Sequence, residues 1–320
     1  MAMRKLAQSL LALLPMLFFC LSGASCPPEV HPWLLKPKRP GVTLLTPDLG
    51  LHHDPSWSPD GQWIVFSSAP MPRGVVSPEI YIMDAQGGNR VRLTNNTAYD
   101  GDPAWSPKGD RIAFVSNRDG TYAIYTMNTD GSDVVRLVEG FSPAWSPDGR
   151  KIAFCTKLDE WAEIAVWENS QVTHLTASTY YDGSPSWSPD GRQIVFSSAR
   201  RDTTKGDLVS GEDTVRLYVM NADGSEQRPL TDGPDDDKDP AWSPDGRWIV
   251  FNRWGYLGSG GESVRLLDIN TGQVQVLLEE PLCREFAWSP DGQLLAFAVV
   301  GDASDIYVMD VAEVLGTPFP

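Results

Sequence analysis

Short segments in which apolar and polar residues alternate run through the chain from residue 42 to residue 310. A period of two is typical of β-strands that bury one face, and turn sequences such as Asp-Gly separate the segments. One class of segment shares an aliphatic residue followed by Tyr and, two positions later, Met: Ile80–Met83, Ile124–Met127, Leu217–Met220 and Ile306–Met309. The pattern predicts an all-β protein made of short strands.

A tryptophan phrase occurs six times in this pattern. Its first copy, residues 54–61, reads Asp-Pro-Ser-Trp-Ser-Pro-Asp-Gly. The six tryptophans are Trp57, Trp105, Trp145, Trp187, Trp242 and Trp288. Successive copies are 48, 40, 42, 55 and 46 residues apart, which is the length of a four-stranded propeller blade. Pro presets φ and Gly accepts positive φ, so Ser-Pro-Asp-Gly predicts a tight turn between the first two strands of each blade.

The sixth repeat lacks its fourth strand. After its third strand, Ile306–Met309, no segment repeats the fourth-strand pattern, whereas Val42–Thr46 looks like a fourth strand with no partners before it. We therefore predict a six-bladed propeller of four-stranded antiparallel blades, in which the N-terminal strand completes the last blade and closes the ring. Closure of this kind removes an exposed sheet edge.

The repeats resemble the WD-like repeats of TolB-type propellers. The resemblance rests on Pro-x-Trp-Ser-Pro-Asp-Gly, the following Ile-Ala-Phe type of run and the later Ile-Tyr-x-Met-Asp, and it covers residues 41–310. It implies the propeller fold but leaves the function open, because one fold serves many functions. TolB carries an α/β domain before its propeller, and only residues 26–40 occupy that place here. Similar propellers accompany a hydrolase domain, but the Gly-x-Ser-x-Gly elbow of such a domain is absent from the sequence.

The N-terminus has the layout of an export signal. Arg4 and Lys5 precede an apolar run over residues 6–21 and the small residues 22–25. Ordinary signal-peptidase cleavage is one interpretation. The other is lipidation of Cys26, which follows Gly-Ala-Ser in a lipobox-like sequence. We predict a signal peptide over 1–25, a Pro-rich stalk over 26–40 and the propeller over 41–320, with the protein in the periplasm or at the cell surface.

Acidic residues dominate the charge of the chain. The 42 Asp and Glu residues outnumber 26 Lys and Arg, which gives a formal net charge of −16. Because nucleic-acid binding needs concentrated cationic side chains, the composition argues against a nucleic-acid partner. We expect a monomer that reaches the membrane only through lipidation of Cys26.

Acidic side chains are also predicted around one mouth of the central channel. The residues three positions before each tryptophan begin the innermost strands, and propeller symmetry places them in a ring; they include Asp54, Asp102, Asp239 and Glu285. We add Asp182 and His53 from neighbouring positions. The carboxylate oxygens of these acids could hold a hard cation such as Ca²⁺. The alternative is that Asp before Pro only caps a turn.

Long insertions between the second and third strands fall on this same face. They carry Arg200, Arg201, Arg253 and Trp254, which are residue types that anchor interfaces; ordinary loop residues are the alternative. We predict a non-catalytic binding or scaffold protein of the bacterial envelope that takes a protein or peptide partner on this loop-bearing face. A carbohydrate-active lyase or hydrolase, or a metal-dependent ligand binder, is the alternative.

Overall fold

Each repeat forms one four-stranded antiparallel sheet in the computed structural model, which describes residues 40–48, 50–70, 77–158, 161–177, 180–200, 214–255, 261–279, 282–301 and 303–316. Blade 1 contains β2 (Gly50–Trp57), β3 (Trp63–Pro70), β4 (Glu79–Asp84) and β5 (Val91–Arg92). Blade 2 contains β6 (Asp100–Trp105), β7 (Arg111–Ser116), β8 (Ala123–Asn128) and β9 (Val135–Glu139). Blade 3 contains β10 (Phe141–Trp145), β11 (Ile152–Leu158), β12 (Trp161–Glu168) and β13 (Gln171–His174).

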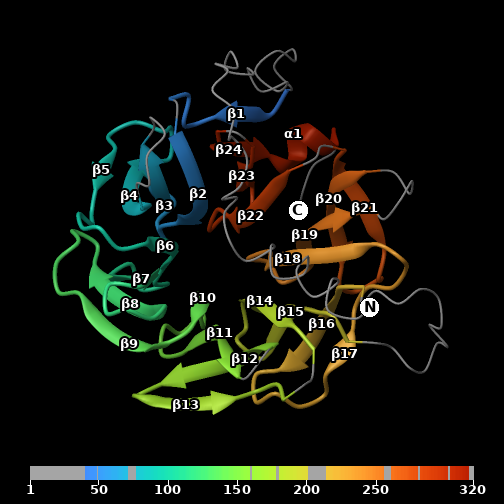
Figure 1. The fold of residues 1–320 in the computed structure, drawn as a ribbon. Coiled ribbons are helices and arrows are strands. Elements are labelled where there is room, and N and C mark those ends of the chain that lie inside the picture. The colour runs from blue at the N-terminus through green and yellow to red at the C-terminus, as the bar shows by residue number, and fades with distance from the viewer. Residues whose placement is uncertain are drawn as a thin grey trace, which may run out of the picture. The chain divides into compact units, whose positions relative to one another are not determined.

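The remaining three blades follow the same order. Blade 4 contains β14 (Asp182–Trp187), β15 (Gln193–Ser198), β16 (Arg216–Asn221) and β17 (Arg228–Pro229). Blade 5 contains β18 (Asp236–Trp242), β19 (Trp248–Trp254), β20 (Glu262–Asp268) and β21 (Val274–Leu278). Blade 6 contains β22 (Cys283–Trp288), β23 (Leu294–Val299), β24 (Asp305–Asp310) and β1 (Val42–Leu44). The six sheets surround one axis, with the first strand of each blade innermost (Figure 1).

The predicted ring closure is confirmed. β1 pairs antiparallel with β24, with Val42 opposite Met309 and Leu44 opposite Tyr307. Beyond β1, the hydroxyl of Thr46 accepts a hydrogen bond from the backbone N–H of Ile306 at 2.8 Å. The same hydrogen bond, from a backbone N–H of the third strand to a threonine hydroxyl that follows or ends the fourth-strand segment, occurs in blades 1, 3 and 4 at Thr94, Thr176 and Thr231. The N-terminal segment therefore has the contacts of a fourth strand.

The repeated tryptophans connect neighbouring blades. The indole Nε1 of Trp145 donates a hydrogen bond of 3.1 Å to the carbonyl of Ala104 in the preceding blade. The indoles of Trp57, Trp187 and Trp288 donate to the matching carbonyls of their own neighbours. Between the blades lie fully buried aromatic and aliphatic side chains, among them one phenylalanine from the second strand of every blade. Four of the six repeated tryptophans therefore join one blade to the next.

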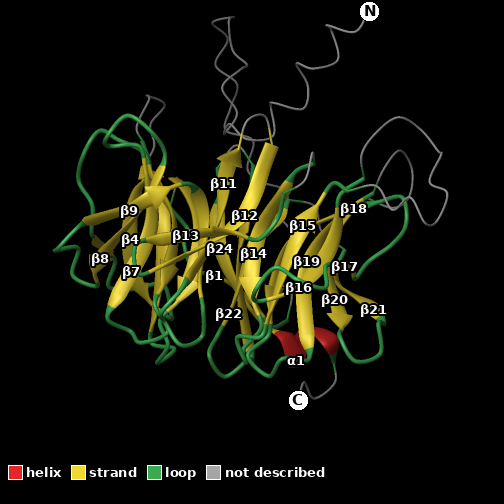
Figure 2. Ribbon diagram, turned by 90° about the horizontal axis from the view of Figure 1, so that it is seen from below, coloured by secondary structure: helices red, strands yellow, loops and turns green. Residues whose placement is uncertain are grey.

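The short helix α1 (Val311–Leu315) follows β24 and marks one face of the propeller (Figure 2). It lies at the end where the Ser-Pro-Asp-Gly turns are, because β24 runs toward that end. The first strands begin at the opposite, loop-bearing end. No helix in the described ranges has the length and apolar character to span a membrane. Cys155 and Cys283 are both buried, and neither forms a disulfide bond within the described residues.

Candidate binding site at the axial mouth

The backbone turns one residue of every first strand toward the axis. Each of the six first strands has a register shift where it pairs with the second strand, and the residue at the shift has a positive φ between 49° and 60°. We call these residues the axial ring: Asp54, Asp102, Ser142, Ser184, Asp239 and Glu285. Asp tolerates this left-handed conformation better than most residues. The predicted ring of acidic residues therefore rests on a repeated β-bulge.

Side chains of the axial ring join one blade to the next. A carboxylate oxygen of Glu285 accepts a hydrogen bond from the backbone N–H of Asp54 at 2.7 Å. Asp54 in turn accepts from the N–H of Asp102, and Asp102 from that of Ser142, each at 3.2 Å. Between blades 4 and 5, the hydroxyl of Ser184 donates to Asp239 at 3.0 Å. The acidic positions thus have a structural use, because they hold neighbouring blades together.

His53 forms an ion pair with one acid of the ring, Glu285. Its Nδ1 lies 3.5 Å from Oε2 of Glu285, and each side chain keeps 28% of its surface exposed. Burial lowers the pKa of His53, but attraction and hydrogen bonding to Glu285 outweigh it and raise this pKa to about 9. Burial likewise opposes ionisation of Glu285, yet the imidazolium keeps the pKa of this carboxyl below its usual value. The two residues form a partly buried ion pair at neutral pH.

The other acids of the ring have too few cationic partners to offset the effect of burial on their pKa values. Burial, followed by repulsion from Glu285 and Asp102, holds the pKa of Asp54 well above its ordinary value. Burial also raises the pKa of Asp102 to about 6 and raises that of Asp239. Such shifts are common at functional sites and also occur in structural networks. Among the described residues, no three His, Cys, Asp or Glu side chains come together as a metal site would require.

Two tyrosines that sequence reasoning did not single out lie beside the ring. The hydroxyl of Tyr99 donates to Asp102 at 3.4 Å, and that of Tyr181 bonds to Ser184. A Cβ added to Gly101 or Gly183 would lie 2.3 or 2.1 Å from these hydroxyl oxygens. The sequence Tyr-Asp-Gly occurs at both places, and this repetition was the signal that could have identified the tyrosines.

Asp182 is placed differently from the axial ring. It is fully buried, and its carboxylate pairs with Arg200 at 2.6 Å. Arg253 pairs with Asp237 at 2.7 Å in blade 5, and Arg118 with Asp100 at 3.0 Å in blade 2. Arg200 and Arg253 are therefore internal ion-pair partners that keep only 18% and 17% of their side chains exposed. Arg201 and Cys26 lie outside the described residues.

Trp254 lies at the loop-bearing end of β19, between two cations of adjacent first strands. The guanidinium carbon of Arg284 is 4.4 Å from the centre of its ring, and the ammonium of Lys238 is 5.3 Å from it. Lys238 and Arg284 occupy the same repeat position as His53, directly before the axial ring. We call Lys238, Trp254 and Arg284 the cationic arc. It lies beside the acidic ring, and sequence reasoning identified only its tryptophan.

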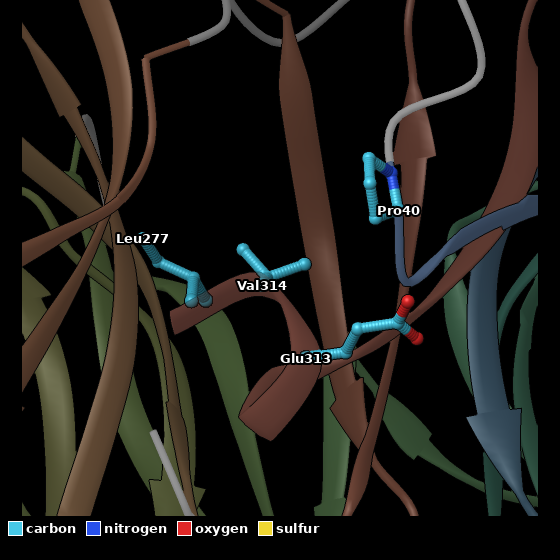
Figure 3. Close-up of a pocket in the computed structure, with 4 residues that line it drawn as sticks. All are labelled: Pro40, Leu277, Glu313 and Val314. Atoms are coloured by element: carbon cyan, nitrogen blue, oxygen red, sulfur yellow. The ribbon is translucent and has the colours of Figure 1, made fainter. Parts of the chain in front are cut away.

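A separate groove of about 280 Å³ lies beside α1, away from the axis. Pro40, Leu277, Glu313 and Val314 line it (Figure 3). Only Glu313 brings a charged side chain to this groove, so it offers no cluster of polar groups comparable to the axial site.

These features define a six-bladed propeller with a polar axial ring. The family model described as the TolB beta propeller domain matches residues 41–205, slightly more than half of the chain. The chain belongs to the TolB β-propeller family.

Solved structures show the same fold. A protein assigned as TolB from Agrobacterium tumefaciens is 22% identical with a TM-score of 0.62, and the match covers 84% of this chain and 96% of that one. TolB from Acinetobacter baumannii is 19% identical with a TM-score of 0.63, covering 83% of this chain and 62% of its own. A Xanthomonas campestris gluconolactonase is 14% identical with a TM-score of 0.61, covering 85% and 90%. No curated protein sequence matches this chain.

Proposed function

We propose that this chain is an exported, non-catalytic binding protein of the bacterial cell envelope. It takes a protein or peptide segment at the loop-bearing mouth of the propeller axis. The signal-like residues 1–25 support export, and Cys26 would supply a lipid anchor if it is modified. The TolB-type structures support a propeller that acts as a scaffold, although this likeness extends to the fold alone.

One comparison within the chain carries the proposal. Positions that the fold needs are nearly alike in all blades, as in the Trp-Ser-Pro-Asp-Gly turns. The position before the axial ring instead holds five different residue types: His53, Gly101, Phe141, Gly183, Lys238 and Arg284. The bulge itself does not require these differences, because it forms in every blade; only at Gly101 and Gly183 does a neighbouring tyrosine hydroxyl leave no room for a larger residue. An asymmetric mouth suits an asymmetric ligand such as a peptide segment.

His53, Asp182 and Asp239 are the titratable residues of the mouth that an acid–base enzyme would need, and their contacts support binding better than hydrolysis. His53 pairs with Glu285, Asp182 with Arg200, and Asp239 with Ser184. General acid–base catalysis needs two such groups directed at one substrate, whereas these three face separate partners. Structures of an oligogalacturonate lyase and of the gluconolactonase share the fold at 15% and 14% identity. At this identity the likeness supports the fold and not an enzymatic activity.

The test compares two faces of the propeller. Immobilised protein is offered envelope extract, beside a mouth variant (Lys238→Ala with Trp254→Ala) and a matched variant of the turn face (Arg150→Ala with Arg192→Ala). The two turn-face arginines are 75% and 85% exposed. We expect a partner that the wild type and the turn-face variant retain and the mouth variant loses. Equal retention by all three, or retention by none, would contradict the proposal; thermal melting confirms that each variant is folded.

A further inference from the structure

We infer that Arg284 is the receptor for a carboxylate group of the bound segment, which deepens the proposed function and rests on it. Arg284 is half-buried at the second position of β22. Its guanidinium lies over Trp254, and its Nε is shielded from solvent without a hydrogen-bond partner among the described residues. Leaving a buried donor of a charged group without a hydrogen bond costs free energy. A ligand that supplies an acceptor to this guanidinium would therefore be stabilised.

Other arginines on this face have their acceptors. Arg118, Arg200 and Arg253 each pair with a buried aspartate that lies five positions before the tryptophan of its blade. In blade 6 that position is Cys283, whose buried thiol offers no carboxylate. Arg284 forms no ion pair with a carboxylate within the described part of the chain. The scaffold thus supplies an ion-pair partner to three arginines, whereas Arg284 has none among the described residues and is open to a ligand.

The charged groups around Arg284 favour a single negative charge. Lys238 is paired with Asp236 at 2.8 Å, and His53 with Glu285. Against the effect of burial, attraction to the guanidinium also lowers the pKa of the Asp239 and Glu285 carboxyl groups, so two further acids lie near it. A doubly charged phosphate would meet repulsion from both acids, whereas a carboxylate carries half that charge. The planar fork of arginine matches a carboxylate with two parallel hydrogen bonds.

Trp254 favours a peptide carboxylate over an acidic sugar. Sugars bind to free aromatic faces, but this ring already carries both Arg284 and Lys238. Stacking holds the guanidinium in place before the ligand arrives, which reduces the entropy lost on binding. The ligand group is therefore a peptide C-terminus or the side chain of an acidic residue, and the two are separated by experiment.

Three acetylated alanine hexapeptides are the probes: one with a free C-terminal carboxylate, one amidated, and one amidated with a central glutamate. Binding is followed through the indole N–H signal of Trp254 in NMR spectra, assigned with Trp254→Phe. We expect saturable shifts at millimolar concentration with at least one carboxylate peptide and none with the uncharged peptide. Whichever carboxylate peptide binds more tightly identifies the terminal or the side-chain group as the ligand.

Arg284→Gln should weaken this binding at least tenfold, and Arg284→Lys should recover part of it through charge alone. Arg192→Gln on the turn face is the matched control and should bind like the wild type. The inference is overturned if Arg284→Gln binds normally, if all three peptides behave alike, or if glucuronate binds more tightly than the peptides. A partner that depends on Lys238 and Trp254 but not on Arg284 would overturn this inference while leaving the proposed function intact.

Discussion

The hydroxyl of Thr46 and the backbone N–H of Ile306 meet at 2.8 Å across 260 residues of chain. Both groups are buried, and the Thr46 hydroxyl also donates to Asp305 at 3.3 Å. This contact fixes the N-terminal segment to blade 6 just past the end of β1.

Thr46→Val should therefore destabilise the whole propeller. The substitution keeps the side-chain shape but leaves the buried N–H of Ile306 unsatisfied, at a cost of about 1–3 kcal/mol. Denaturant unfolding measures the loss, and Thr46→Ser, which retains the acceptor, should lose less. A Thr46→Val protein as stable as the wild type would contradict the importance of this contact for closure.

Arg200→Gln should cost about 3–5 kcal/mol of stability, because it leaves the fully buried carboxylate of Asp182 without its ion-pair partner. Thermal or denaturant unfolding gives the value. Adding Asp182→Asn to the same chain should restore much of the loss by removing the stranded charge. The exposed Arg192 is the matched control, and Arg192→Gln should change stability little. A small effect of Arg200→Gln would restore Arg200 as a candidate for partner contact.

Stability should fall as the pH rises from 7 to 10. The folded-state pKa of His53, about 9, lies above its ordinary value of 6.5. The ion pair with Glu285 therefore stabilises the fold fully below pH 6.5 and is lost as the pH passes 9. Unfolding curves of wild type and His53→Gln should differ most near pH 6 and converge near pH 10. A constant difference over this range would show that the His53 charge does not contribute.

Asp102→Asn should stabilise the protein at neutral pH. The folded state holds the Asp102 proton up to a pKa of about 6, above the ordinary 3.8. Ionisation therefore costs stability progressively between pH 4 and 6, and the cost is full above that range. Asparagine removes the charge and keeps one oxygen acceptor. We expect a gain near pH 8 and little change near pH 4; a loss at both pH values would mean that the hydrogen bonds to Ser142 and Tyr99 matter more.

The repeated sequence pattern was enough to predict the fold. The Trp phrase encodes the tight turns and the strand periodicity of each blade, and the Val42–Thr46 segment has the pattern of the strand that is missing from the last blade. The axial ring was also predictable, since ring symmetry brings equivalent positions together. The roles of Arg200 and Arg253 as internal ion-pair partners were harder to predict. Their ion pairs cross between neighbouring strands, and only the similar separation from their aspartates, 18 and 16 residues, could have revealed it. The contact of Arg284 with Trp254 joins two blades, and no equivalent contact is found among the described residues of the other repeats.

The closing strand also sets the order in which the protein can be completed. β1 is the first of the described strands along the chain, and its partner β24 follows about 260 residues later. Blades 1 to 5 each contain all of their strands in one continuous stretch and can form as soon as that stretch is free to fold. Blade 6 alone waits for both ends of the propeller, so its completion is the step that turns a row of sheets into a ring.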